Sequence, residues 1–377
     1  MPSPDQAVLR RYPGSDRRVE HEVREEIRRL FDSRSLRAEK YGPLFASLWK
    51  TAAQCVMGGK LLRPRLLLEA FDALCPAGGQ SEPLRAAAVR IAAATELLHY
   101  SFLLHDDVID GDVLRRGRPN LVGAVLAERG SRRPATWRAM SADDHDVHWA
   151  RTSGILMGDM LLSDAHHAFA REPLPEPVRI RLLDLLDHAI TESIVGEHLD
   201  VALGDGVITP DLETVLSMTR LKTATYTFEL PLKAAAIVAG ASRRTEDALG
   251  RVAGHLGVVF QLQDDLLSAF GDAAEHGKDA LSDLREGKET AIIAFARTTE
   301  SWRTIERFLG DPGLSPSDAM TVRRHLTDCG AEAFVGSLVA EHLRAARWLL
   351  VSPDSAVPPG LAGFLHRTMQ KLETRRS

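Results

Sequence analysis

The chain has 377 residues, of which 44% are hydrophobic and 26% are charged, proportions typical of a folded globular protein. Its formal net charge of -5 argues against a broad nucleic-acid-binding surface. The polar N-terminus has no signal-peptide core, and no uninterrupted apolar run reaches the roughly 18 residues of a transmembrane segment. Three scattered cysteines form neither a disulfide framework nor a metal-binding spacing, which is typical of a reducing compartment. We therefore expect a cytoplasmic protein.

Apolar residues recur at helical spacing through most of the chain, and no alternating run of strand length stands out. Residues 1–16 are predicted to be a loose tail. Residues 128–147, which include an acidic cluster at 143–146, are predicted to be a solvated polar surface loop, and residues 353–360 a second connector. We expect an all-α protein in which residues 17–377 form a single domain.

The longest apolar helix is expected from about Leu84 to Asp110, where Gly111 offers a stop. Asp106 and Asp110 are four residues apart and share a helical face, with Asp107 beside them. Three carboxylates on one turn repel each other, and a divalent cation removes that penalty. Carboxylate oxygens suit Mg²⁺ in particular. The alternative is a charged helix end that is exposed to water.

Cationic residues accompany this acidic turn along the chain. Lys60 and Arg63 follow a Gly-Gly pair, and Arg115 and Arg116 come within six residues of Asp110. Arginine can hold a phosphate through two hydrogen bonds, while lysine acts as a point charge. The pattern is what a metal-bound polyphosphate needs. The alternatives are solvated cations after Gly-Gly, and salt bridges from the two later arginines to the aspartates.

A second acidic turn, Asp264-Asp265, lies inside another apolar helix, three residues after Gln261. Cations follow it again, at Lys278 and Lys288. A Lys-Thr pair on a third helix, Lys222-Thr223, could add a phosphate contact. Two such turns facing each other across a cavity could hold several Mg²⁺ ions around one diphosphate.

Together these motifs resemble those of the trans-isoprenyl diphosphate synthases of the polyprenyl synthetase family, above all the geranylgeranyl and farnesyl diphosphate synthases. The resemblance runs from about residue 58 to residue 288. It implies an isoprenoid synthase bundle of about 10–14 helices around a central cavity, usually a homodimer. It also implies an enzyme with two or three Mg²⁺ ions per active site. Such an enzyme condenses isopentenyl diphosphate with an allylic diphosphate (dimethylallyl, geranyl or farnesyl).

The resemblance assigns a role to each polar residue of the motifs. Asp106 and Asp110 would ligate Mg²⁺ on the allylic diphosphate with Asp107 adjoining, and Asp264 would ligate a further Mg²⁺ with Asp265 beside it. The residues implied for the allylic diphosphate itself are Arg115, Lys222, Thr223, Gln261, Lys278 and Lys288. Those implied for isopentenyl diphosphate are Lys60, Arg63, His99 and Arg116.

The sequence departs from the family pattern at Ser268, where the second motif usually has a third aspartate. A neutral hydroxyl is a weaker ligand than a carboxylate. Two other functions remain open. A terpene cyclase uses the same metal chemistry but does not need the cations that bind isopentenyl diphosphate. A non-catalytic partner subunit of a heteromeric synthase tends to lose its Asp-rich motifs.

Residues one helical turn ahead of Asp106 are expected to line the cavity in which the product grows. Phe102 lies four residues ahead and Ser101 five. In the family, bulky aromatic residues at these two positions shorten the product and small ones lengthen it. The pair predicts a short product, geranylgeranyl diphosphate (C20), with farnesyl diphosphate (C15) as the alternative.

Overall fold

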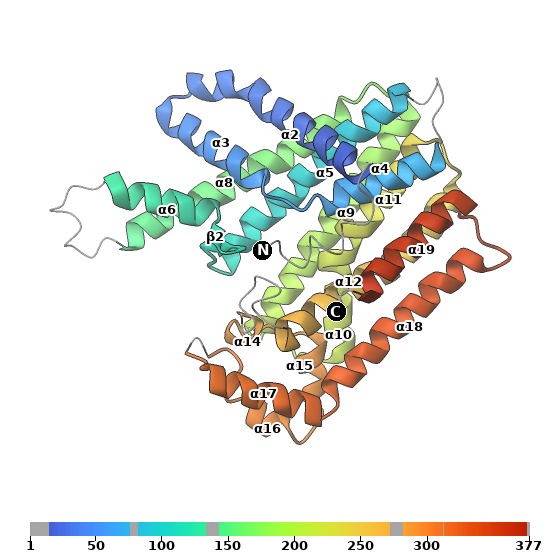
Figure 1. Ribbon diagram of the computed structural model, residues 1–377. Helices are drawn as coiled ribbons and strands as arrows, with labels where there is room; N and C mark the ends of the chain where they lie inside the picture. Colours follow the sequence, from blue (N-terminus) through green and yellow to red (C-terminus); the bar gives the residue numbers. More distant parts are fainter. Residues whose placement is uncertain (1–14, 76–81, 133–142, 272–281, 312, 375–377) are drawn as a thin grey trace. The chain divides into compact units, whose positions relative to one another are not determined.

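The computed structural model describes residues 15–75, 82–132, 143–271, 282–311 and 313–374. Helices dominate these residues (Figure 1). Within them, the β-structure is a single antiparallel pair of two-residue strands, β1 (Leu114–Arg115) and β2 (Arg118–Pro119). The predicted all-α class is confirmed.

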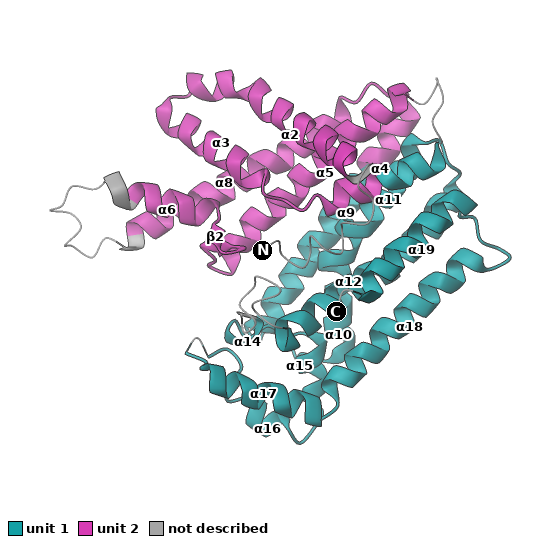
Figure 2. Cartoon of the chain, in the orientation of Figure 1, with its two compact units in different colours: residues 1–12, 69–81, 184–377 teal, residues 13–68, 82–183 magenta. Residues whose placement is uncertain are grey.

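The chain divides into two compact units (Figure 2). Unit 2 takes its described residues from Pro13–Leu68 and Glu82–Leu183, and unit 1 takes its own from Glu69–Ser81 and Asp184–Ser377. Residues 1–14 of the predicted tail lie outside the described residues, and the first helix begins at Ser15. The single domain over residues 17–377 stays a prediction.

Unit 2 is built around α5. Its helices are α2 (Ser15–Lys40), α3 (Pro43–Val56), α5 (Glu82–Ile109), α6 (Leu121–Arg132) and α8 (Asp143–Ala170). Two more helices, α4 (Leu62–Leu74) and α9 (Glu176–Gly204), contribute residues to both units. α5 packs against α8 and α2, so it is covered on more than one side.

The helix predicted from about residue 84 to 110 is confirmed as α5. It ends before Gly111, whose φ of 75° is a conformation that glycine adopts without steric cost. By length and composition α5 could cross a membrane, but 72% of its most apolar stretch is buried, as in the core helix of a globular unit. The acidic turn therefore lies at the C-terminal end of a core helix, where the helix dipole disfavours negative charge.

The surface loop predicted for residues 128–147 is wrong at both ends. α6 continues to Arg132 and α8 begins at Asp143, and only residues 133–142 lie outside the described residues. Arg129 Nε donates to the carboxylate of buried Asp146 at 3.1 Å. This ion pair between α6 and α8 stabilises segments whose polar composition suggests a loop.

Unit 1 is centred on α12 (Arg243–Phe270), which packs against η1 (Arg220–Glu229), α11 (Leu230–Val238) and α18 (Ala331–Val351). Ser242 begins α12 as its N-cap, accepting a hydrogen bond from Thr245 N at 3.2 Å. Of the connector predicted at residues 353–360, residues 353–358 lie between α18 and α19 (Pro359–Glu373), and the last two residues begin α19. The remaining helices of this unit are α10 (Leu212–Thr219), α14 (Ser282–Arg285), α15 (Ala291–Ala296), α16 (Trp302–Ile305), α17 (Pro316–Asp328) and α19 (Pro359–Glu373).

Two glycines let neighbouring helices approach η1 closely. A Cβ atom on Gly257 of α12 would lie 2.1 Å from the Ala224 side chain, and one on Gly196 of α9 would lie 2.2 Å from the Lys222 backbone nitrogen. η1 is a π-helix, a form that recurs at functional sites. The two close contacts fix the backbone that carries Lys222 and Thr223.

A pair of half-buried histidines lies where α12 meets α18. The Nδ1 atoms of His255 and His342 are 2.9 Å apart, so one ring must donate and the other accept. Burial lowers the pKa of His255. Burial also lowers the pKa of His342, and nearby His255 lowers it further, while Glu341 opposes this. The folded protein therefore resists protonation of this pair.

We expect the melting temperature to fall as the pH is lowered below about 6.5, the pKa of an unperturbed histidine. Below that pH the unfolded chain binds protons that the folded pair excludes, so stability rises with pH across this window and is lost on acidification. The double variant His255→Gln/His342→Gln should flatten this part of the curve. Thermal denaturation of both proteins between pH 5.5 and 8 measures the difference, and parallel curves would contradict the expectation.

Candidate active site

The first acidic turn, at the end of α5, is bound by an arginine of the short β-hairpin. Arg115 Nη2 donates to Asp106 Oδ2 at 3.1 Å and to Asp107 Oδ1 at 2.6 Å, and its Nε donates to Asp107 Oδ1 at 3.1 Å. The salt bridge considered as an alternative for Arg115 is therefore present. Arg116 donates to the backbone oxygen of Gly58 at 2.8 Å.

The three aspartates of this turn differ in environment. Asp107 is 2% exposed, and burial raises the pKa of its carboxyl to about 6, with Arg115 opposing the shift and Asp106 adding to it. Asp106 is half-buried and Asp110 is exposed. Asp107 thus faces Arg115 in the interior, while Asp110 is accessible from solvent one turn after Asp106.

This donor set fits Mg²⁺. No three His, Cys, Asp or Glu side chains converge as a preformed metal cage in the described part of the chain. Mg²⁺ does not need one, because it keeps several waters and is usually held by one or two carboxylates together with substrate phosphates. Asp106, in the last turn of α5, and Asp110, directly after the helix, could provide two such carboxylates.

A cluster of arginines from other elements lies near His99, which is on α5 like the first acidic turn. Burial lowers the pKa of His99 well below its usual value, and nearby Arg63, Arg115 and Arg116 lower it further. His99 is therefore neutral at pH 7 and offers hydrogen bonds rather than charge. Of the residues implied for isopentenyl diphosphate, Arg63, His99 and Arg116 come together, and Lys60 is exposed in the turn before α4.

The backbone around this cluster is strained. Among the described residues, the non-glycine residues with positive φ are Leu61, at 54°, and Arg116, at 56°. Such conformations persist where the surroundings enforce them, often at functional sites. Leu61 is 1% exposed and anchors the turn, so that Arg63 lies in the first turn of α4. Cations at a helix N-terminus are unfavourable by themselves, and a bound anion offsets this.

In unit 1, Lys222 of η1 lies between two carboxylates of α9. Its Nζ is 3.1 Å from Glu197 Oε1 and 2.6 Å from Asp200 Oδ2. Neither acid was among the residues predicted for the site. They are three positions apart on one helix, and this spacing is the only sequence signal that could have suggested them.

The second acidic turn is connected to η1 through an amide. Thr223 Oγ1 donates to Gln261 Oε1 at 3.0 Å, and Gln261 Nε2 donates to Asp265 Oδ1 at 2.9 Å. Gln261 therefore orients the buried carboxylate of Asp265, while Asp264 on the same turn is half-buried. The arrangement parallels the first turn, where one aspartate is held by a neighbour and another is more accessible.

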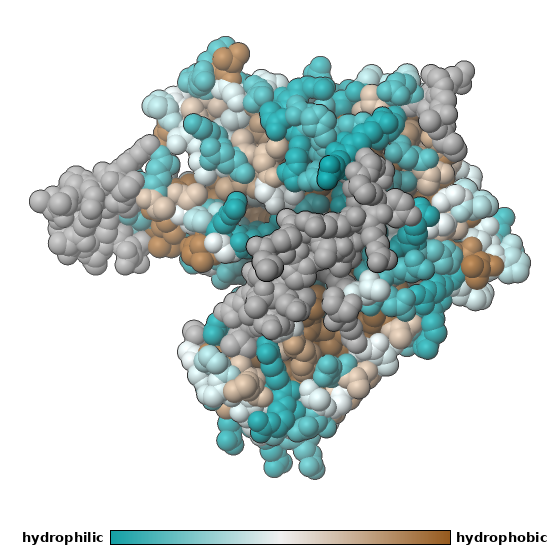
Figure 3. Space-filling model, viewed as in Figure 1, coloured by the Kyte–Doolittle hydropathy of each residue, from teal (hydrophilic) through white to brown (hydrophobic). Residues whose placement is uncertain are grey.

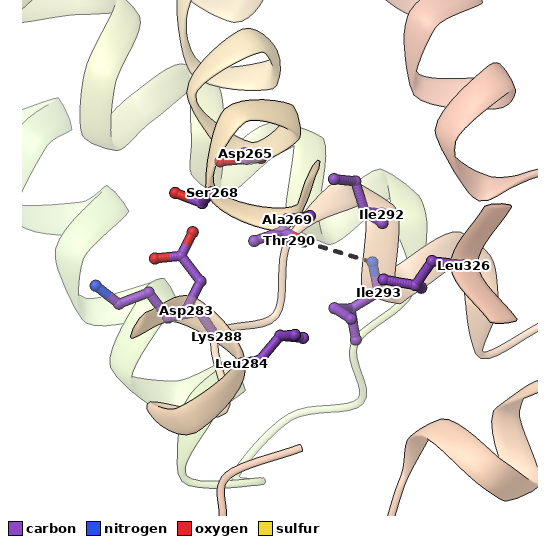
Figure 4. Close-up of a pocket in the computed structure, with 10 residues that line it drawn as sticks. All are labelled: Asp265, Ser268, Ala269, Asp283, Leu284, Lys288, Thr290, Ile292, Ile293 and Leu326. Carbon is purple, nitrogen blue, oxygen red and sulfur yellow. Dashed lines mark hydrogen bonds between the residues drawn. The ribbon is translucent and has the colours of Figure 1, made fainter. Parts of the chain in front are cut away.

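A small pocket lies beside this turn (Figure 4). Asp265 and Ser268 of α12 line it together with Asp283 of α14 and Lys288, and the Asp283 carboxylate points toward Ser268. Asp283 was not predicted as a site residue, because its carboxylate comes from a different helix. Lys288 pairs with Glu286 at 2.9 Å. Lys278 lies outside the described residues.

The two residues expected to set chain length, Ser101 and Phe102, differ in burial. Ser101 is fully buried, and its Oγ donates to the backbone oxygen of Gly158 on α8 at 2.8 Å. Phe102 is half-buried. Ser101 thus joins two core helices through its hydroxyl, and whether either side chain lines the product cavity stays a prediction.

Carboxylates and cations gathered in this way suit an enzyme class that handles diphosphates with the help of a divalent metal. Comparison with known proteins defines the family. The polyprenyl synthetase model matches residues 46–321, most of the chain. The chain therefore belongs to the polyprenyl synthetase family, and it is a trans-prenyltransferase.

Its relatives include enzymes with short products. The chain is 31% identical to a geranylfarnesyl diphosphate synthase from Aeropyrum pernix, over 78% of this chain and 83% of that protein. It is 30% identical to a geranylgeranyl diphosphate synthase from Methanosarcina mazei, over 77% and 78% of the two chains. A solved geranylgeranyl pyrophosphate synthase from Corynebacterium glutamicum, complexed with isoprenyl diphosphate and magnesium, is 28% identical. It superposes with a TM-score of 0.83 over 95% of this chain and 99% of that one.

Proposed function

We propose that this prenyltransferase condenses isopentenyl diphosphate with an allylic diphosphate and releases a short all-trans prenyl diphosphate. One observation carries the proposal: Arg63 and Arg116, together with neutral His99, form a second cluster beside the acidic turn, in the same unit. A terpene cyclase acts on one diphosphate and has no use for a second anion site. The family relatives support the same reaction class.

We assign the charges to steps of this reaction. When bound, Mg²⁺ would stabilise negative charge on the departing diphosphate. Asp106, Asp110 and Asp264 would hold two or three such ions, and Asp283 would supply the carboxylate that Ser268 lacks. The residues that would hold and orient the allylic diphosphate are Arg115, Lys222, Thr223, Gln261, Lys278 and Lys288.

Isopentenyl diphosphate is assigned to the other cluster. Arg63 and Arg116 would bind its diphosphate by charge-assisted hydrogen bonds, neutral His99 would add a hydrogen bond, and Lys60 would close the site from solvent. When isopentenyl diphosphate is held there, its double bond attacks the allylic carbon. The departed diphosphate then accepts the proton that the condensed intermediate loses. Apolar walls must exclude water from the allylic cation.

The test is an incubation of the purified protein with Mg²⁺, farnesyl diphosphate and labelled isopentenyl diphosphate. The proposal predicts an elongated prenyl diphosphate. A hydrocarbon formed without isopentenyl diphosphate would instead support a terpene cyclase. Turnover that begins only when a second protein is added would support a non-catalytic partner subunit.

We further propose that the protein acts in the cytoplasm.

For the product we propose geranylgeranyl diphosphate, in keeping with relatives that make C20 and C25 chains. Phe102→Ala is expected to lengthen the main product by at least one C5 unit, because removal of the ring opens volume in the cavity without touching a charge. Chromatography of the dephosphorylated products measures the shift. An unchanged distribution would place the floor of the cavity elsewhere.

We propose that the protein is a homodimer that uses an exposed apolar face of α8. Trp149 and Leu156, seven residues apart on one helical face, are 36% and 60% exposed. Leu156→Glu is expected to halve the mass seen by light scattering. Val207→Glu, at a residue 74% exposed in the turn after α9, is the control and should leave the mass unchanged. A dimeric Leu156→Glu protein would contradict this interface.

A further inference from the structure

A buried carboxylate that the proposed reaction does not use lies under the turn that carries Lys60. Glu96, on α5 one turn before His99, is 3% exposed. Its Oε1 lies so close to Gly59 that a Cβ atom there would be 2.5 Å from it. Its Oε2 is buried and has no hydrogen-bond partner among the described residues. An acceptor in that state is costly unless charge compensates it.

The compensating charge comes from three arginines on three elements. Burial raises the pKa of Glu96, and the fields of Arg63, Arg116 and Arg24 oppose that shift. Arg63 belongs to α4, Arg116 to the β-hairpin and Arg24 to α2. The electrostatic fields of three arginines that are far apart in sequence therefore meet at this one buried side chain.

Two of these arginines also donate hydrogen bonds to the turn itself. Arg116 donates to the backbone oxygen of Gly58 at 2.8 Å. Arg24 donates to the backbone oxygen of Gly59 at 3.3 Å and to that of Met57. The turn is thus contacted by Glu96 and by two guanidinium groups.

We propose that Glu96 is a positioning residue that sets Arg63, Arg116 and the Gly58–Lys60 turn for one diphosphate. The inference rests on the proposed function in taking that diphosphate to be isopentenyl diphosphate. Arg63 is only 7% exposed, and a buried guanidinium that loses its counter-charge moves toward water. Bidentate phosphate binding depends on that geometry.

Loss of the Glu96 charge would also act directly on diphosphate affinity, in the direction opposite to the loss of positioning. A less negative site attracts an anion more strongly, which by itself would tighten diphosphate binding. A purely electrostatic role therefore predicts a lower KM in Glu96→Gln, whereas a positioning role predicts a higher one. The direction of the change separates the two.

The experiment measures KM for each substrate separately in Glu96→Gln, which keeps the side-chain size against Gly59 and removes the charge. We expect KM for isopentenyl diphosphate to rise about tenfold or more, with kcat and the KM for the allylic diphosphate nearly unchanged. Glu96→Asp, which keeps the charge, should recover part of the affinity. An unchanged or lower KM for isopentenyl diphosphate would overturn the inference.

Glu172→Gln is the matched control. Glu172 is also 3% exposed and pairs with Arg90, whose Nε lies 3.0 Å from its Oε2, in the same unit. It should lose stability without a change in either KM. Calorimetric titration of isopentenyl diphosphate without Mg²⁺ gives a second measure that needs no turnover. If the wild type binds this ligand but makes no product, the proposed function fails while the comparison of Glu96→Gln with wild type still decides the inference.

Discussion

Asp106→Asn and Asp110→Asn are each expected to lower kcat by about a thousandfold or more. Each substitution keeps the side-chain size and removes one charged oxygen ligand from the end of α5. A thousandfold loss corresponds to about 4 kcal/mol of transition-state stabilisation, a reasonable share of what a metal supplies at a departing diphosphate. Initial rates at saturating substrate and Mg²⁺ measure the effect.

The fold should survive both substitutions, because neither carboxylate is fully buried. Circular dichroism and thermal denaturation check this. Asp187→Asn, at an exposed aspartate of α9, is the control and should leave kcat unchanged. Near wild-type turnover in either variant of the first acidic turn would refute the assignment of Asp106 or Asp110 to the metal.

Gly257→Ala is expected to lower both stability and activity, although it lies outside the charged site. Its Cβ would be 2.1 Å from the Ala224 side chain, so α12 and η1 must move apart. Overpacking of this kind costs about 1–3 kcal/mol. The shift would misplace Lys222 and Thr223, and a misplacement of about 1 Å can cost about 100-fold in rate.

Gly254→Ala on the same helix is a sharp control, because nothing lies within 4 Å of its Cβ position. Removal of a glycine from a helix interior should stabilise the protein by roughly 0.4–1 kcal/mol. The two substitutions should therefore change the melting temperature in opposite directions. Equal shifts, or full activity in Gly257→Ala, would mean that the contact with η1 does not position the site.

The sequence predicts those parts of the protein that depend on local periodicity. α5 and its acidic turn follow from apolar spacing and from Gly111, and the second acidic turn on α12 follows in the same way. The segment 128–147 was predicted wrongly because the ion pair between Arg129 and Asp146 stabilises helix in a polar stretch. A pairing across 17 residues leaves no mark on local composition.

The partners of the predicted side chains could not be read from the sequence either. Lys222 and Gln261 were predicted from their motifs, but the acids that hold Lys222 lie on a helix more than 20 residues earlier. Asp283 approaches Ser268 from another helix, and Glu96 is one acid in an apolar segment. Only the packing of elements brings these charges together.

We propose that this chain joins an allylic diphosphate to isopentenyl diphosphate and releases one inorganic diphosphate. The most direct measurement follows inorganic diphosphate release and isopentenyl diphosphate consumption in the same reaction, with Mg²⁺ and an allylic diphosphate. We expect one inorganic diphosphate to be released per isopentenyl diphosphate consumed, and none when isopentenyl diphosphate is omitted or Mg²⁺ is chelated. Release without isopentenyl diphosphate at a comparable rate, or no release under any of these conditions, would contradict it.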